Sequence, residues 1–163
     1  MTRKSNKSMM PFLLIGLIIL VIYLLFFFTN NNNNIQSITD LTDNWINAVT
    51  VKNDASQVAN LFCKEANLVG TVSQTIRRNA AIQQYFEFFA KLPNIKVLEK
   101  KYDIERIDNN VWLNTSFVTW NWDGLAEPLV VRMIFVFKGN CIFQLHGSEL
   151  PEINNDLRNM PNY

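Results

Sequence analysis

Hydrophobic positions change their spacing twice along this chain, and each pattern predicts a different structure. Residues 9–28 are apolar or small and carry no charge, and about twenty such residues in a helix match the roughly 30 Å hydrocarbon core of a bilayer. Residues 37–92 place apolar side chains three and four positions apart, as one face of a helix requires. After Pro93, apolar and polar residues alternate over short runs, which is typical of strands.

Three helices are predicted between Ser37 and Pro93. Ser37 followed by Asp40 is a helix start signal. Asp54 is expected to cap a short second helix, and Asn79 a third helix that ends before Pro93. A short β-branched stretch before that helix, 68–73, predicts a strand or an extended crossing segment. The apolar faces of the first and third helices, which we expect to pack in the core, are Ile38, Leu41, Trp45, Ala48 and Val49, and Ile82, Tyr85, Phe86 and Phe89.

Four antiparallel strands are predicted after the helices, at 95–107, 111–122, 129–138 and 141–150. Turn residues separate them, and Gly139-Asn140 is a two-residue hairpin signal. Trp112, Trp120 and Trp122 share one strand face, where they could line a pocket, form an oligomer interface or fill the core. The predicted fold class is α+β, with three N-terminal helices packed on a curved antiparallel sheet.

The N-terminal apolar run predicts a single-pass membrane protein with an uncleaved signal-anchor. Arg3, Lys4 and Lys7 precede the run, and no further basic residue occurs before Lys52. The positive-inside rule then places residues 1–8 in the cytoplasm and the rest of the chain in the lumen or outside the cell. A cleaved signal peptide is the alternative, but the run is long and lacks a small-residue cleavage site. The predicted organisation continues with an Asn-rich flexible linker at 29–36, a folded domain at 37–151 and a polar tail at 152–163.

The amino-acid composition limits which partners and cofactors are expected for this chain. Of fifteen basic residues, three precede the apolar run, which leaves twelve against fourteen acidic residues in the remainder. This balance argues against nucleic acid as a partner. One histidine and scattered carboxylates give no metal-ligand spacing, so neither a metal nor a cofactor is expected. Cys63 and Cys141 lack a C-x-x-C spacing, and the sequence leaves open whether they form a disulfide or stay as thiols.

Five segments together resemble a known family. They are Gly70-Thr71-Val72-Ser73, Arg77, Ile82-x-x-Tyr85-Phe86-x-x-Phe89, Arg132-Met133-Ile134-Phe135-Val136-Phe137 and Leu145-His146-Gly147-Ser148-x-Leu150-Pro151. Over 39–151 their order and spacing resemble the association domain of calcium/calmodulin-dependent protein kinase II and its free-standing relatives, in the nuclear transport factor 2-like (SnoaL-like) superfamily. The resemblance implies a cone-shaped α+β domain that forms dimers or rings. Kinase signatures are absent from the sequence, which excludes kinase activity.

The last segment departs from the family pattern at two positions. Free-standing relatives typically end in His-His-Ser-Ser-x-Met-Pro, whereas Leu145 stands here at the first histidine and Gly147 at the first serine. Only His146 and Ser148 carry over, so a mechanism that needs paired histidines is not expected.

Strand alternation predicts the candidate site. His146 and Ser148 share one face of the last strand, and Arg132 lies on one face of its expected neighbour, so these side chains could look into the cone together. A guanidinium favours a carboxylate or another anion, and a histidine can transfer protons near neutral pH. The predicted ligand-binding residues are Arg77, Tyr85, Arg132, His146 and Ser148. The alternative is that Glu65 or Glu87 neutralises Arg132 and that His146 is a core residue.

The preferred functional hypothesis is a membrane-anchored, non-catalytic domain that forms homo-oligomers and binds a small anionic or carboxylate-bearing ligand. The enzyme alternative is an isomerase or hydrolyase for a hydrophobic carbonyl substrate, with His146 as catalytic base and Arg132 as oxyanion partner. A third hypothesis is a structural protein whose cone is filled by Trp and Phe side chains. Asn114 begins an Asn-Thr-Ser sequon, which predicts glycosylation if the domain is translocated.

Overall fold

A computed structural model describes residues 10–71 and 73–150 of the chain. The chain divides into two compact units, 1–36 and 37–163. The predicted basic segment 1–8, the residues Met9 and Pro151 and the predicted tail 152–163 lie outside the described residues.

Helix α1 (Met10–Thr50) overturns the predicted membrane anchor. It runs without interruption through 29–36, where a flexible linker was predicted. Its described apolar side chains from Leu14 to Phe26, and that of Phe28, are exposed. Among the described helices, none is both long and apolar enough to cross a membrane. The predictions of a transmembrane helix at 9–28 and of a single-pass protein with a lumenal or extracellular domain are therefore wrong.

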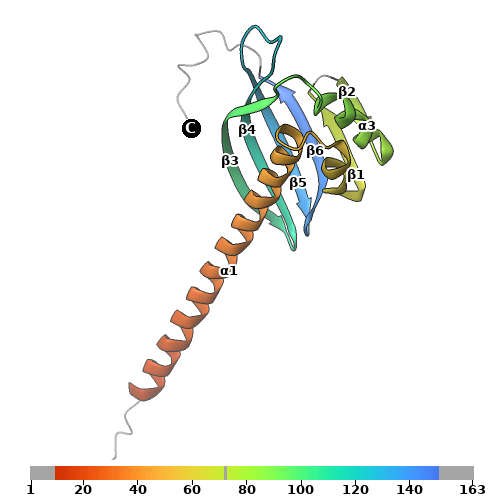
Figure 1. The fold of residues 1–163 in the computed structure, drawn as a ribbon. Helices are drawn as coiled ribbons and strands as arrows, with labels where there is room; N and C mark the ends of the chain where they lie inside the picture. The colour runs from red at the N-terminus through yellow and green to blue at the C-terminus, as the bar shows by residue number, and fades with distance from the viewer. Residues whose placement is uncertain (1–9, 72, 151–163) are drawn as a thin grey trace, which may run out of the picture. The chain divides into compact units, whose positions relative to one another are not determined.

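The second unit is built on one six-stranded sheet in the order β2-β1-β6-β5-β4-β3 (Figure 1). The strands are β1 (Phe62–Gly70), β2 (Ser73–Arg77), β3 (Lys96–Asp108), β4 (Val111–Asn121), β5 (Leu129–Lys138) and β6 (Cys141–Glu149). Neighbouring strands are antiparallel except β1 and β6, which are parallel. The α+β class and the four C-terminal antiparallel strands are confirmed, but the sheet is mixed and not purely antiparallel.

Two short helices complete the domain, α2 (Ala55–Asn60) and α3 (Ala80–Phe89). Asp54 caps α2 as predicted, because its carboxylate accepts a hydrogen bond of 3.0 Å from the Gln57 backbone N–H. Asn79 precedes α3 with a φ of 51° and makes no side-chain cap bond. It therefore acts through a left-handed turn and not through the predicted cap. Because β1 and β2 separate α2 from α3, the three helices are not consecutive.

Trp45 stands at the centre of the core that joins helices and sheet. Its ring makes edge-to-face contacts with Phe86 of α3, Trp120 of β4 and Phe135 of β5, at centroid distances of 5.7, 6.1 and 5.4 Å. Only 1% of Trp45 is exposed. The aromatic stripes that the sequence assigns to the core are therefore confirmed as core.

A buried polar network also joins α1 to β4. The Asn114 amide donates to the Thr42 hydroxyl at 2.8 Å, and the Ser116 hydroxyl donates to the Asn114 oxygen at 2.9 Å. All three side chains are fully buried. Because Asn114 is enclosed and bonded through both of its amide atoms, its side chain is not accessible to a glycan in the folded domain; glycosylation at Asn114 stays a prediction that this burial argues against.

A disulfide links Cys63 of β1 to Cys141 of β6, with their Cα atoms 5.1 Å apart. The sequence left open whether the two cysteines form a disulfide or stay as thiols, and the structure shows the disulfide. The parallel register of the two strands is interrupted between Phe62 and Asn67. The disulfide thus joins the strands next to the point where their regular pairing breaks.

A polar contact fixes α1 against the edge strand β3. The Tyr102 hydroxyl donates to the Asp43 carboxylate, and the Lys100 ammonium donates to the same oxygen at 2.5 Å. Burial raises the pKa of Tyr102, and the hydrogen bond and the negative charge of Asp43 raise this pKa further. The phenol therefore stays protonated in the folded protein to higher pH than in the unfolded chain.

This raised pKa predicts a specific alkaline destabilisation. Tyr102 contributes stability below its ordinary pKa of about 10, and that contribution is lost as the pH rises, because the unfolded chain releases the proton first. In urea titrations between about pH 9 and 11, we expect the free energy of unfolding to fall more steeply for the wild type than for Tyr102→Phe. The difference should stay below about 1.4 kcal/mol per pH unit, since Tyr102 is only half-buried. Parallel curves would contradict the assignment.

Candidate functional site

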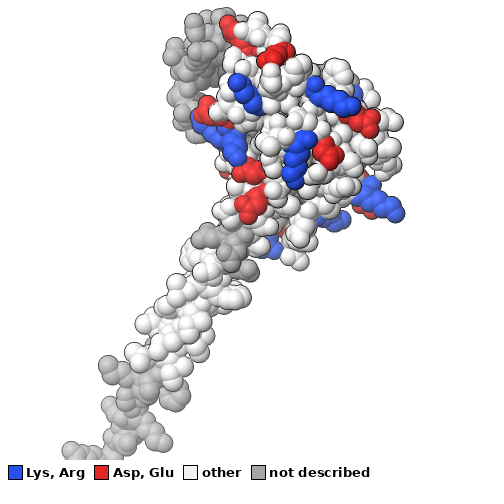
Figure 2. Space-filling view, in the orientation of Figure 1, with Lys and Arg blue, Asp and Glu red and all other residues white. Residues whose placement is uncertain are grey.

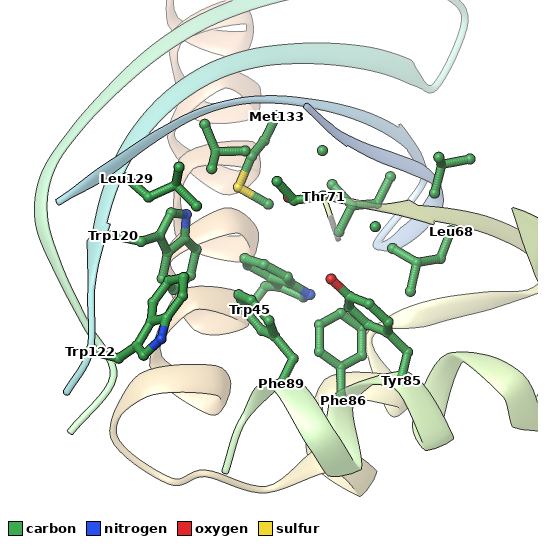
Figure 3. Close-up of a pocket in the computed structure, with 15 residues that line it drawn as sticks. Trp45, Leu68, Thr71, Tyr85, Phe86, Phe89, Trp120, Trp122, Leu129 and Met133 are labelled. Atoms are coloured by element: carbon green, nitrogen blue, oxygen red, sulfur yellow. The ribbon is translucent and has the colours of Figure 1, made fainter. Parts of the chain in front are cut away.

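A narrow cavity lies between the helices and the sheet of the second unit (Figure 3). Its volume is about 30 Å³, which holds one or two water molecules. The wall is aliphatic and aromatic, with Thr71 and Gly147 at one side. The aromatic residues of the wall are Trp45, Tyr85, Phe86, Phe89, Trp120 and Trp122. The cone is therefore largely filled by side chains.

Trp45 brings an unsatisfied donor to this cavity. Its indole Nε1–H is buried and has no hydrogen-bond partner within the described part of the chain. Figure 3 shows the Trp45 nitrogen and the Tyr85 hydroxyl pointing toward the same region of the cavity. Buried indole N–H groups nearly always have an acceptor. The site can therefore provide a directed hydrogen bond to a bound molecule.

Tyr85 is seated against the β1–β2 turn. A Cβ on Gly70 would lie 2.6 Å from the Tyr85 hydroxyl oxygen, so the ring occupies space that only glycine leaves free. Burial raises the pKa of Tyr85, while the nearby Arg77 charge and a hydrogen bond with the Thr71 backbone act in the opposite direction. The hydroxyl is therefore neutral at physiological pH.

Arg77 and Tyr85 are the two predicted site residues that the structure brings together at the cavity. The Arg77 guanidinium carbon lies 4.7 Å from the centroid of the Tyr85 ring, a cation–π contact. Arg77 also donates to the Thr75 carbonyl at 3.0 Å. It is half-buried at the end of β2 and does not line the cavity.

The other three predicted residues lie on the opposite face of the sheet. Arg132 and His146 are exposed, and Ser148 is half-buried. Arg132 is opposite Ser148 in the β5–β6 register, so the three do share one face as predicted. That face points away from the cavity, whose β6 wall consists of Leu145 and Gly147.

A bulge in β6 explains why His146 and Ser148 face outward, whereas Arg132 faces outward through the regular alternation of β5 between buried Val131 and Met133. Val136 is opposite Gln144, but Phe137 is opposite Ile142, so Phe143 is an extra residue. Without the bulge, buried Ile142 would share its face with Gln144 and His146. The additional residue turns the rest of the strand over, so that Leu145 and Gly147 face inward. A Cβ at Gly147 would lie 2.7 Å from the Thr71 hydroxyl, so a larger residue there would require the Thr71 side chain to move.

Sequence reasoning missed Trp45 as a site residue. It assigned this residue to the apolar face of a helix, which is correct, but a buried indole also needs an acceptor for its N–H group. The need of a buried indole for an acceptor is the signal that could have identified Trp45 as a site residue. Trp120 and Trp122 line the cavity. Of the three roles that the sequence left open for them, lining a pocket is the one that this position supports.

No charged residue is among the described residues that line this cavity. On the outer surface, basic and acidic side chains are interspersed over the face of the domain that Figure 2 shows. Within 10–71 and 73–150, no group of three or more His, Cys, Asp or Glu residues is arranged to hold a metal ion.

Solved structures share this fold at low sequence identity, whereas no protein-family model and no curated protein matches the chain. A protein from Xanthomonas campestris, provisionally assigned as a calcium/calmodulin-dependent protein kinase II association domain, has a TM-score of 0.61 and 23% identity, with 71% of this chain and 87% of that chain covered. A provisionally assigned dehydratase of the nuclear transport factor 2-like family from Streptomyces avermitilis has a TM-score of 0.66 and 11% identity, with coverage of 74% and 99%. The canthaxanthin-binding orange carotenoid protein of Anabaena has a TM-score of 0.60 and 20% identity, with coverage of 74% and 38%.

These comparisons show the fold. The second unit has the nuclear transport factor 2-like fold, as the sequence resemblance implied. Identities of this size do not carry an activity from one protein to another.

Proposed function

We propose that this domain is a non-catalytic binding domain that holds a small, mainly apolar ligand in the aromatic cavity. The observation that carries the proposal is the composition of the wall. The described polar side chains of the wall are all neutral. They belong to Trp45, Thr71, Tyr85, Trp120 and Trp122. Neither a carboxylate nor an imidazole is among the described residues that line it. Such a wall favours binding of an apolar molecule over proton-transfer chemistry.

The predicted enzyme mechanism has less support. It required His146 as a base inside the cone, beside Arg132, yet both side chains are exposed on the other sheet face. Arg77, beside Tyr85, is the better candidate to meet a polar end of the ligand at the rim.

Ligand entry requires movement of side chains at the rim, because the cavity of about 30 Å³ is smaller than an organic molecule of even a few carbon atoms. Trp122 and Leu129 line the cavity and are only half-buried. Trp122 follows the end of β4, and Leu129 is the first residue of β5. Rotation of these two side chains would widen the cavity without breaking the sheet.

The binding proposal is tested by titrating the full-length chain with indane, a compact apolar probe, in a calorimeter. We expect saturable binding to the wild type. Val131→Phe should weaken it at least about tenfold, because Val131 lines the cavity and the larger ring would fill it. Val51→Phe is the control, since Val51 is 73% exposed and does not line the cavity. Absence of binding to the wild type, or equal losses in both variants, would refute the proposal.

A second function, self-association, is supported by the sheet face opposite the cavity, which carries exposed apolar side chains among the described residues. Phe117 of β4 and Val130 of β5 are 42% and 39% exposed there. Arg132 is opposite Phe117 in the register, so a charged group borders this apolar surface. Aromatic and arginine side chains are enriched in protein interfaces. We propose that a second copy of the chain packs on this face, with Arg132 and His146 in the contact.

Sedimentation of the full-length chain tests the proposed association. A dimer or larger ring is expected for the wild type, and Phe117→Asp should weaken association at least about tenfold because it buries a charge at the contact. Phe88→Asp is the control, since Phe88 is 68% exposed on α3 and outside the proposed contact. A monomeric wild type would rule the interface out.

A further inference from the structure

We infer that the ligand of the cavity presents an uncharged oxygen acceptor, such as a ketone, to the Trp45 indole N–H. This inference rests on the proposed binding function and specifies its chemistry. It starts from a donor that is 99% buried, lines the cavity and has no acceptor in the described protein. An unsatisfied buried donor is costly to keep, and a ligand oxygen would remove that cost.

The Trp45 ring cannot easily turn to find another acceptor. Three aromatic rings hold it edge-to-face, from Phe86, Trp120 and Phe135, at centroid distances between 5.4 and 6.1 Å. They come from α3, β4 and β5, so the indole is held by three separate elements. Rotation would push the indole into at least one of these rings. The acceptor must therefore come from the cavity.

The charge distribution selects a neutral acceptor. Burial of a carboxylate requires a compensating cation or several donors inside the site. Among the described lining residues there is no cation. The nearest predicted cation, Arg77, lies against the Tyr85 ring and donates to the Thr75 carbonyl, outside the lining. An anion would thus remain at the rim, whereas a carbonyl oxygen can enter.

Tyr85 provides a second neutral group beside Trp45. The backbone of Thr71 forms a hydrogen bond with the Tyr85 hydroxyl, and Figure 3 shows that hydroxyl directed toward the Trp45 nitrogen. Because the phenol stays protonated, its O–H can also donate. A carbonyl oxygen with two lone pairs can accept from both groups.

The inference is tested with two probes of the same skeleton, indane and 1-indanone, which differ by one carbonyl group. Calorimetry on the full-length wild type should give a Kd about fivefold to tenfold lower for the ketone. In Trp45→Phe the ratio of the two Kd values should fall to about one, whatever the change in the affinity for indane itself. Trp112→Phe is the matched control, because Trp112 is buried in β4 but does not line the cavity.

Each other outcome has a separate meaning. Equal affinity for the two probes in the wild type would overturn the inference and leave the proposed binding function standing, and the N–H would then be satisfied by a trapped water. Binding of neither probe would refute the proposed function itself. Stronger binding of indane-1-carboxylate than of the ketone would overturn the choice of a neutral acceptor. A ketone preference that survives in Trp45→Phe would assign the hydrogen bond to another donor.

A direct measurement covers the case in which Trp45→Phe does not fold. The indole ¹H–¹⁵N signals of the wild type report each of the four tryptophans, and the Trp45 signal should shift on addition of 1-indanone and much less on addition of indane. An unchanged Trp45 signal at saturating ketone would overturn the inference.

Discussion

Replacement of Trp45 by alanine is expected to lower the free energy of unfolding by about 3–5 kcal/mol, the usual range for a large buried aromatic residue. The ring is 1% exposed and contacts rings from α3, β4 and β5, so its loss leaves a cavity at the junction of three elements. Domains of this size are stable by only about 5–15 kcal/mol. Urea denaturation followed by circular dichroism measures the change.

Trp45→Phe distinguishes the contribution of ring packing to the free energy of unfolding from the contribution of the indole N–H group. Phenylalanine keeps most of the ring contacts and removes the unpartnered donor, so we expect a loss of less than about 2 kcal/mol. If Trp45→Ala cost less than about 1 kcal/mol, the central role of this residue in the core would be wrong.

Removal of the disulfide is expected to have a comparable effect. Cys63 and Cys141 are separated by 78 residues, and the loop-closure estimate for a crosslink of this span is about 4 kcal/mol. The double variant Cys63→Ser, Cys141→Ser should therefore unfold at much lower urea concentration than the oxidised wild type. Reduced wild type should match the double variant, because both lack the same crosslink. Equal midpoints with and without reductant would show that the crosslink does not stabilise this domain.

Local residue patterns were sufficient to predict the four C-terminal strands. Each is rich in β-branched and aromatic residues or alternates polar with apolar ones over part of its length, and left-handed residues mark the hairpin turns, with Asn110 at a φ of 59° and Gly139 at 60°. The starts and ends of the predicted strands agree with the structure within one residue. Alternation and turn chemistry are local properties, which is why one sequence reveals them.

Other parts of the fold depend on contacts that local patterns do not record. Lys64 and Glu65 interrupt the apolar pattern of β1, because both side chains are exposed at the break in its pairing with β6. The parallel β1–β6 pair joins segments far apart in the chain, and local spacing cannot identify such a neighbour. Only part of β1 and β2 was therefore predicted, as one short extended stretch.

The candidate site was predicted in part for a related reason. Arg132, His146 and Ser148 were correctly assigned to one face, but periodicity alone does not say which face is buried. The burial of Val131 and Met133 decides this for Arg132 in β5, and the bulge at Phe143 decides it for His146 and Ser148 in β6. Inward-facing Leu145 was a usable signal, since a leucine in the middle of a strand next to an exposed histidine favours burial of the leucine.

The bulge at Phe143 also bears on how this domain can change over evolution. Cavity residues and outer-surface residues alternate along β5 and β6, so that Val131 and Val130, or Gly147 and His146, are neighbours in the chain but are subject to separate selection. If both proposed functions hold, substitutions can therefore alter ligand preference without altering assembly. A one-residue deletion at Phe143 would restore simple alternation in β6 and exchange the two sets there, while the residues of β5 would keep their faces. An insertion or deletion in this short segment would then change ligand preference and assembly together, whereas a substitution changes one of them at a time.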